Sequence, residues 1–184
     1  MVNPSVTLEA GGLRVEFIRQ ADRYRHEIVA SAGERVRPWL ASLEGTADEA
    51  WPASPPWQEV HLERREEHMQ VALLVGRAGR SHWSMSVEAD RLKVTLTFDI
   101  ACRCSAPNGW LGSSYKLAES DTSVIDLHGS LLRYSAFQVQ VVQGDAQLSE
   151  AGDERLLRIA AHADVAPGPQ TVRWKYCLGP LGRE

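Results

Sequence analysis

Histidine, carboxylate and hydroxyl side chains recur at two-residue spacing in the middle of the chain. They include Glu59 and His61 in one run, His82 and Ser84 in the next, and Asp99 in a third. Alternate side chains of a β-strand point to the same face and lie about 7 Å apart. Such a pair is spaced to hold one small polar molecule, or to exchange a proton with it. These five residues therefore form the core of the candidate site.

Alternation of apolar and polar residues with a period of two predicts that these runs, and most others in the chain, are strands. The predicted strands are residues 13–19, 23–31, 57–64, 69–75, 82–88, 92–104, 113–117, 131–143, 156–163 and 171–178. The connections are too short to place helices between parallel strands. We therefore predict an all-β fold, an antiparallel β-sandwich of about ten strands.

Helix is expected to be scarce. The best candidate is Trp39–Glu44, where Pro38 occupies the favoured first position and Gly45 ends the element. At most two short helices are predicted in total. The length of 184 residues corresponds to one domain, so residues 1–184 are predicted to form a single β-sandwich domain.

A tight turn at Ala89–Asp90 would pair Val87 with Leu92. In this register apolar residues lie opposite apolar ones on one face of the hairpin, and polar residues lie opposite polar ones on the other face. Extending this register across four strands gives two rows on the polar face. The first row contains Glu59, Val75, His82 and Thr97, and Asp99 lies beside it. The second row contains His61, Leu73, Ser84 and Thr95. A slip of two residues would change these pairs and preserve the faces. The polar face is either a solvated surface or a concave binding site.

Aromatic residues follow this region, in the segment 107–115. Trp110 lies between two glycines, and Tyr115 follows five residues later. The preceding strand ends at Cys104, on the edge that holds Asp99, so we expect Trp110 and Tyr115 to close one end of the polar face. An apolar wall with a few polar groups is typical of a ligand pocket. The alternative is that this loop only caps the core.

Metal, nucleotide and nucleophile motifs are not found in the sequence. Cys102 and Cys104 are separated by one residue, whereas structural zinc sites use wider spacing, and both continue the apolar side of their strand. We predict buried thiols, no metal and no cofactor. No Gly-x-Ser-x-Gly elbow or dinucleotide motif occurs. His26 aligns with Tyr24 and Ile28, which predicts a histidine in the core.

The charge and hydropathy of the chain limit the kinds of partner that are expected. With 20 Lys+Arg against 24 Asp+Glu the formal charge is -4, and no basic run is present, so nucleic acid is not expected. The longest apolar run, Val71–Val75, is far shorter than the roughly 20 residues of a membrane helix, so no membrane association is expected. Three cysteines do not form the framework of a secreted protein. We expect a cytoplasmic location.

Three functions remain open. The leading prediction is a non-catalytic protein that binds a small polar ligand, with carbohydrate as the best guess. The second is a sugar-active enzyme of the mutarotase, epimerase or lyase kind, using His82 with Glu59 or Asp99 as acid–base groups. The third is a scaffold that forms homo-oligomers through its sheet face.

Overall fold

The computed structural model describes residues 5–32, 35–105, 109–118, 126–128, 130–134, 137–151, 154–162 and 168–181. The strands are β1 (Ser5–Ala10), β2 (Leu13–Gln20), β3 (Arg23–Ala32), β4 (Arg35–Ser42), β5 (Trp57–Arg64), β6 (Met69–Ala78), β7 (Ser81–Asp90), β8 (Thr95–Cys104), β9 (Gly112–Leu117), β10 (Asp126–His128), β11 (Leu131–Tyr134), β12 (Phe137–Gln143), β13 (Asp145–Ala151), β14 (Glu154–Ala160) and β15 (Gln170–Pro180). In these ranges no helix is found that is long and apolar enough to cross a membrane.

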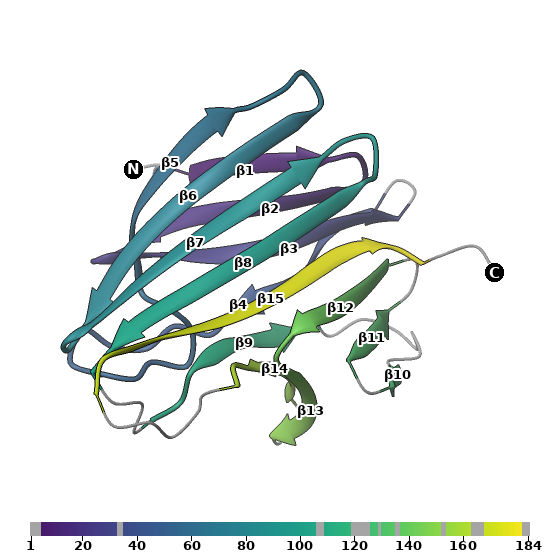
Figure 1. The fold of residues 1–184 in the computed structure, drawn as a ribbon. Helices are drawn as coiled ribbons and strands as arrows, with labels where there is room; N and C mark the ends of the chain where they lie inside the picture. Colours follow the sequence, from purple (N-terminus) through teal and green to yellow (C-terminus); the bar gives the residue numbers. More distant parts are fainter. Residues whose placement is uncertain are drawn as a thin grey trace.

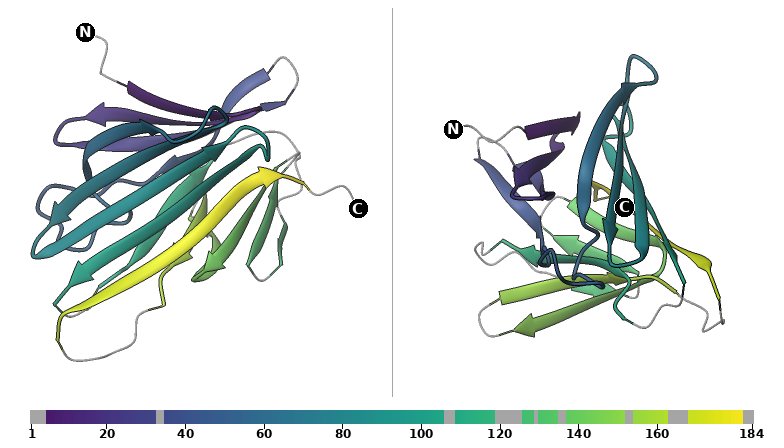
Figure 2. Two further views of the ribbon diagram at one scale, coloured as in Figure 1. Left: turned by 45° about the horizontal axis from the view of Figure 1, so that its top comes forward. Right: turned by 90° about the vertical axis from the view of Figure 1, so that its left-hand side faces the viewer.

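All the strands belong to one antiparallel sheet, in the order β10-β11-β12-β15-β8-β7-β6-β5-β3-β4-β9-β14-β13, with β1 and β2 joined at the other edge of β3. The sheet curls back on itself, so that β1–β4 lie behind β5–β8 and β15 (Figures 1 and 2). The prediction of an antiparallel all-β fold is confirmed. The prediction of a ten-strand sandwich is wrong, because the layers are parts of one nearly closed, barrel-like roll.

The roll turns its corner at β3. One edge of β3 pairs with β2 along its length. The other edge is shared between two strands: β4 pairs with residues 27–32, and β5 meets β3 only at the bridge between Tyr24 and Trp57. Because β5 diverges from β3 after this bridge, β5–β8 and β15 form a front layer with a free outer face.

Residues 39–42 belong to a strand, and the predicted helix over Trp39–Glu44 is not formed. β4 pairs with β3 and β9, and its register with β3 shifts between Ile28 and Val29, opposite Pro38 and Leu40. Proline has no N–H to donate and is tolerated at such a bulge. Because the extra residue lets neighbours face the same side, Trp39 and Leu40 are both buried. Pairing and burial override the local helix signal.

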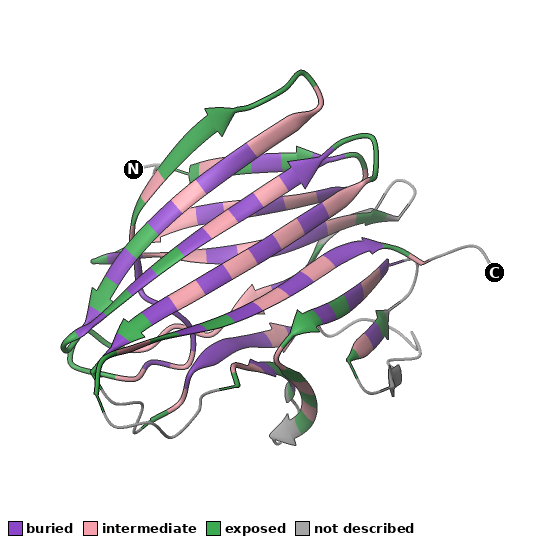
Figure 3. Cartoon of the chain, in the orientation of Figure 1, coloured by how far each residue is buried: buried purple, intermediate pink, exposed green. Residues whose placement is uncertain are grey.

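Buried and more exposed residues alternate along the front strands (Figure 3), which separates an interior from an exterior face. In β8 the side chains of Leu96, Phe98, Ile100 and Cys102 are fully buried, whereas the residues between them are partly or largely exposed. Cys104 is buried as well, so both thiols of the pair lie on the apolar side, as predicted.

The observed register differs from the predicted one in two hairpins. Glu59 lies opposite Val75, as expected, but Val75 lies opposite Ser84 and Val87 opposite Phe98. The Asp90 carboxylate explains the second difference, because its Oδ1 accepts hydrogen bonds from the backbone N–H groups of residues 92 and 93 at 2.9 and 3.1 Å. Asp90 therefore precedes the turn instead of forming it. Both shifts are even, so each side chain keeps its predicted face.

Candidate functional site

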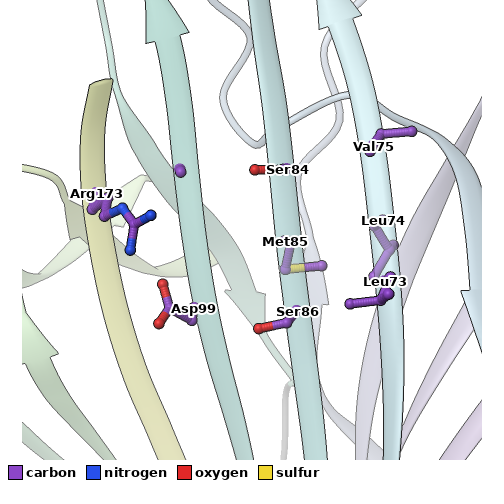
Figure 4. A pocket seen from close by; sticks show the side chains of 9 residues that line it. Leu73, Leu74, Val75, Ser84, Met85, Ser86, Asp99 and Arg173 are labelled. Carbon is purple, nitrogen blue, oxygen red and sulfur yellow. The ribbon is translucent and has the colours of Figure 1, made fainter. Parts of the chain in front are cut away.

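The outer face of β6, β7, β8 and β15 is hollowed. The first hollow has a volume of about 420 Å³ and is lined by Leu73, Leu74, Val75, Ser84, Met85, Ser86, Asp99, Ala101 and Arg173 (Figure 4). Two further hollows continue it towards the C-terminal end of β8. The lining of the second, of about 390 Å³, adds His82, Arg103 and Thr171. The third, of about 440 Å³, shares His82 and Arg103 with the second, and its lining adds Arg80 and Pro169. We call these adjoining hollows the outer-face groove.

Cross-strand pairing explains why the groove is hollow. Ser84 and Ala101 are opposite each other in the middle of the face, and their small side chains form a low floor. Val75, on one side of Ser84, is 48% exposed and forms an apolar wall. Arg173, on the other side of Ala101, forms the opposite wall. The groove therefore combines an apolar side with a charged side, as ligand pockets do.

Charges are unevenly distributed along this groove. Asp99 forms an ion pair with Lys175 at 3.6 Å across β8 and β15. Both side chains are well exposed, so the pair contributes little to stability. The guanidinium of Arg173 lies on the same side of the strands as Asp99 (Figure 4). Beyond Arg173 the lining is cationic, with Arg103 and Arg80.

Three of the predicted site residues meet in this groove: His82, Ser84 and Asp99 line it. Glu59 and His61 lie on β5, opposite Val75 and Leu73, and are exposed at the side of the groove without lining it. The predicted polar face is thus present on the outside of the molecule, but the groove is displaced from β5 towards β15.

Trp110 and Tyr115 do not close this groove, which corrects their expected placement. β9 pairs with β4 and β14, so it lies in the other part of the roll and does not fold back over β8. Trp110 donates its indole N–H to the carbonyl of Ala53 at 2.9 Å and stacks beneath the guanidinium of Arg158. Tyr115 is fully buried in the interior.

The proposed acid–base pairs are not formed. Asp99 lies opposite Ser86, which is four residues from His82 along β7, a separation of about 13 Å. Glu59 is two strands away from His82, and Val75 lies between them. General acid–base partners must come within hydrogen-bond reach of the same substrate atom or its neighbour. The groove therefore offers binding groups that are too widely spaced to share one proton transfer.

A buried polar network fills part of the interior and was not predicted from the sequence. Nε2 of His26 is hydrogen-bonded to the hydroxyl of Tyr115 at 2.8 Å, and that hydroxyl also bonds the hydroxyl of Tyr176. Ser113 accepts from the indole N–H of Trp174 at 2.9 Å. His26 is 1% exposed, so its predicted place in the core is confirmed. The network ties β3, β9 and β15 together.

Burial keeps this network uncharged. It lowers the pKa of His26 to about 3 and raises the pKa of Tyr176 to about 12. The pKa of Tyr115 is raised well above its usual value by burial and by the neighbouring Tyr176. Groups that transfer protons in catalysis need pKa values near the working pH. At neutral pH this network is therefore a structural element of the core.

Glu44 is the exception among the buried groups. Burial raises its pKa to about 7, although a hydrogen bond from the hydroxyl of Ser42, at 2.6 Å, and nearby arginines favour the ionised form. The same Ser42 hydroxyl accepts from the backbone N–H of His26 at 2.9 Å. Glu44 Oε2 is buried without a hydrogen-bond partner. This carboxyl was not predicted, because Glu44 was expected at the end of a short helix over Trp39–Glu44.

Among the residues that the structure describes, no three His, Cys, Asp or Glu side chains come close enough together to hold a metal ion. No family model matches this chain, and neither does any curated protein or any solved structure. The residues of the outer-face groove are therefore the basis on which a function is assigned.

Proposed function

We propose that this protein is a non-catalytic binding protein whose outer-face groove holds a small polar ligand, and that the ligand is a carbohydrate. One observation carries the proposal: a hollow of about 420 Å³ is lined by the apolar side chains of Leu73 and Val75 together with the polar side chains of Ser84, Ser86 and Asp99. This volume lies within the usual range for small-molecule pockets.

The lining supports a sugar because a pyranose has apolar C–H faces and a rim of hydroxyl groups. Leu73 and Val75 can cover a C–H face. The hydroxyls of Ser84 and Ser86 both donate and accept, the carboxylate of Asp99 accepts, and the guanidinium of Arg173 donates. The lining thus offers both donors and acceptors to the hydroxyls on one side of the ring.

An enzyme is the weaker alternative. A mutarotase, epimerase or lyase would need an acid and a base on either side of one carbon atom. The separation of His82 from Asp99 favours binding without chemistry. Self-association is also less well supported, because the large exposed apolar residues among those described, Leu62, Val75, Leu92 and Val142, lie on four different segments.

We also propose a cytoplasmic location. Cys102, Cys104 and Cys177 are all free thiols. Cytoplasmic proteins keep their cysteines reduced, whereas secreted domains use them in disulfide bonds.

A carbohydrate array tests the binding function, followed by titration calorimetry with any sugar that binds. Ser84→Leu places a larger side chain on the floor of the groove, so we expect it to weaken sugar binding by about tenfold or more. The matched control is Ser149→Leu, at an exposed serine on β13. Sugar binding that Ser84→Leu leaves unchanged, or an array on which no sugar binds, would contradict the proposal.

A further inference from the structure

The end of the outer-face groove near the C-terminal end of β8 is lined by three arginines and a histidine. His82 and Arg103 line both of its hollows, joined by Arg173 in one and by Arg80 in the other. No carboxylate is among the described residues that line these two hollows. This concentration of positive charge is unexpected on a chain whose formal charge is -4.

Strand register brings these side chains together. His82 lies directly opposite Arg103, across β7 and β8. Arg103 lies opposite Thr171, so Arg173 is its diagonal neighbour on β15, at about 7–8 Å between the backbones. Arginine side chains are long enough to cover this distance. The guanidinium groups of Arg103 and Arg173 can therefore reach the same bound group.

In the described part of the chain, none of the three arginines of this cluster forms an ion pair, although Asp99 lines the same hollow as Arg173. Arg80, Arg103 and Arg173 have no side-chain hydrogen-bond partner within these described residues either, whereas Arg65 on the same face pairs with Glu88 at 3.4 Å. Like charges on neighbouring strands repel each other and destabilise the sheet. A bound anion would relieve this repulsion.

We infer that the outer-face groove binds a phosphate-bearing small molecule, with the phosphate held by Arg103, Arg173 and His82. The rest of the ligand lies in the adjoining hollow, over Ser84 and beside Asp99. This inference rests on the proposed binding function and names the class of ligand. Arginine guanidinium groups recognise phosphate through paired N–H donors. Donors that converge from three strands suit a tetrahedral group with several oxygens better than a planar carboxylate, which one arginine can satisfy.

The anion is a small molecule and not a nucleic acid. Nucleic-acid binding depends on many phosphate contacts along an extended basic surface. Here the cations occupy one end of a groove, and the opposite end carries Asp99 and, further along the strands, Glu88. A second phosphate in line with the first would meet these carboxylates, whose charges are already paired with Lys175 and Arg65. The charge distribution therefore fits a ligand with a phosphate at one end and neutral polar groups at the other.

The test is an NMR titration of the full chain with inorganic phosphate at constant ionic strength, observing the arginine Nε–H and backbone amide signals. We expect saturable shifts at Arg103, Arg173 and His82. The double variant Arg103→Ala/Arg173→Ala should weaken binding by about tenfold or more, and its amide spectrum should remain that of the folded chain because both side chains are exposed. The matched control is Arg91→Ala, at an exposed arginine in the turn between β7 and β8, which should bind phosphate as the wild type does.

Two further probes, glucose and glucose 6-phosphate, separate this inference from the proposed function. Tighter binding of glucose 6-phosphate than of glucose, lost in the double variant, supports the inference. Phosphate binding without binding of any neutral sugar also supports it, and contradicts the broader carbohydrate assignment. Neutral sugar binding with no saturable phosphate shift, or equal phosphate affinity in the double variant and the wild type, would overturn the inference alone.

Discussion

The hydroxyl of Tyr115 lies 2.8 Å from Nε2 of His26, across the interior of the roll, although 89 residues separate the two in the chain. The strands that carry them, β9 and β3, are not paired with each other, and both are neighbours of β4. Their side chains therefore link two strands that share no backbone hydrogen bond.

Removing the hydroxyl with Tyr115→Phe should lower the free energy of unfolding by about 1–3 kcal/mol, because His26 and Tyr176 would lose a hydrogen-bond partner inside the core. Urea denaturation measures this change. Tyr24→Phe is the control: Tyr24 is partly exposed, with its ring beneath Arg19, and should change stability by less than about 0.5 kcal/mol. Equal effects of the two variants would show that the buried network does not stabilise the fold.

His26 should make the protein sensitive to acid. In the unfolded chain an imidazole takes up a proton near pH 6.5, whereas burial lowers the pKa of folded His26 to about 3. Between these values the unfolded state binds more protons, so the free energy of unfolding falls as the pH falls, by up to about 5 kcal/mol. The loss between pH 6.5 and pH 4 should be smaller in His26→Gln than in the wild type. His61→Gln, at an exposed histidine, should retain the wild-type slope.

Glu44 should change the free energy of unfolding with pH in the direction opposite to His26. Burial raises its pKa from 4.5 to about 7, so between these values the folded state binds more protons than the unfolded state. Its contribution to the free energy of unfolding is therefore present below pH 4.5 and is lost as the pH rises through 7, about 3 kcal/mol in all. Unfolding curves at pH 5 and pH 8 should differ less for Glu44→Gln than for the wild type. Glu63→Gln is the exposed control, and an identical pH dependence in all three proteins would refute this assignment.

Gly76 should be intolerant of any side chain. A Cβ atom at this position would lie 1.8 Å from the carbonyl oxygen of Pro56, where β5 begins. Gly76→Ala should therefore destabilise the protein by about 2 kcal/mol or more, because backbone must move. At Gly12 a Cβ would meet its nearest neighbours at 3.6 Å, so Gly12→Ala should be tolerated. Thermal unfolding of the two variants provides the comparison, and a stable Gly76→Ala protein would contradict the close packing of β5 on β6.

The outward face of His82, Ser84 and Asp99 could be predicted from sequence because alternation along a strand depends only on local sequence. The exact pairs could not, since a register depends on the turn. The Asp90 carboxylate binds the backbone of the residues after it and moves the turn to 91–94. Because the register of β7 and β8 shifts by an even number of residues, each side chain keeps its predicted face but has different cross-strand neighbours.

The arginine side of the groove could not be predicted from the sequence for a different reason. The alternation of Val172, Trp174 and Tyr176 predicts that Arg173 faces outward, but not that β15 lies beside β8. That pairing joins distant segments and depends on how the whole roll closes. Tyr115 was misplaced for a related reason: β9 is buried on both faces, with Ser114 bonded to Ser54 of a covering loop, so its sequence shows no alternation.

The position of β15 between β8 and β12 affects how the protein is made. The chain is synthesised from its N-terminus, so β8 emerges from the ribosomal exit tunnel before β15, the strand that pairs with its edge. Until residues 170–180 emerge, β8 presents unpaired backbone groups on which another nascent chain can dock. Arg173 arrives with β15 as well, so the groove is complete only once this late strand has been inserted. A ligand that needs Arg173 would therefore bind only chains in which β15 is already in place.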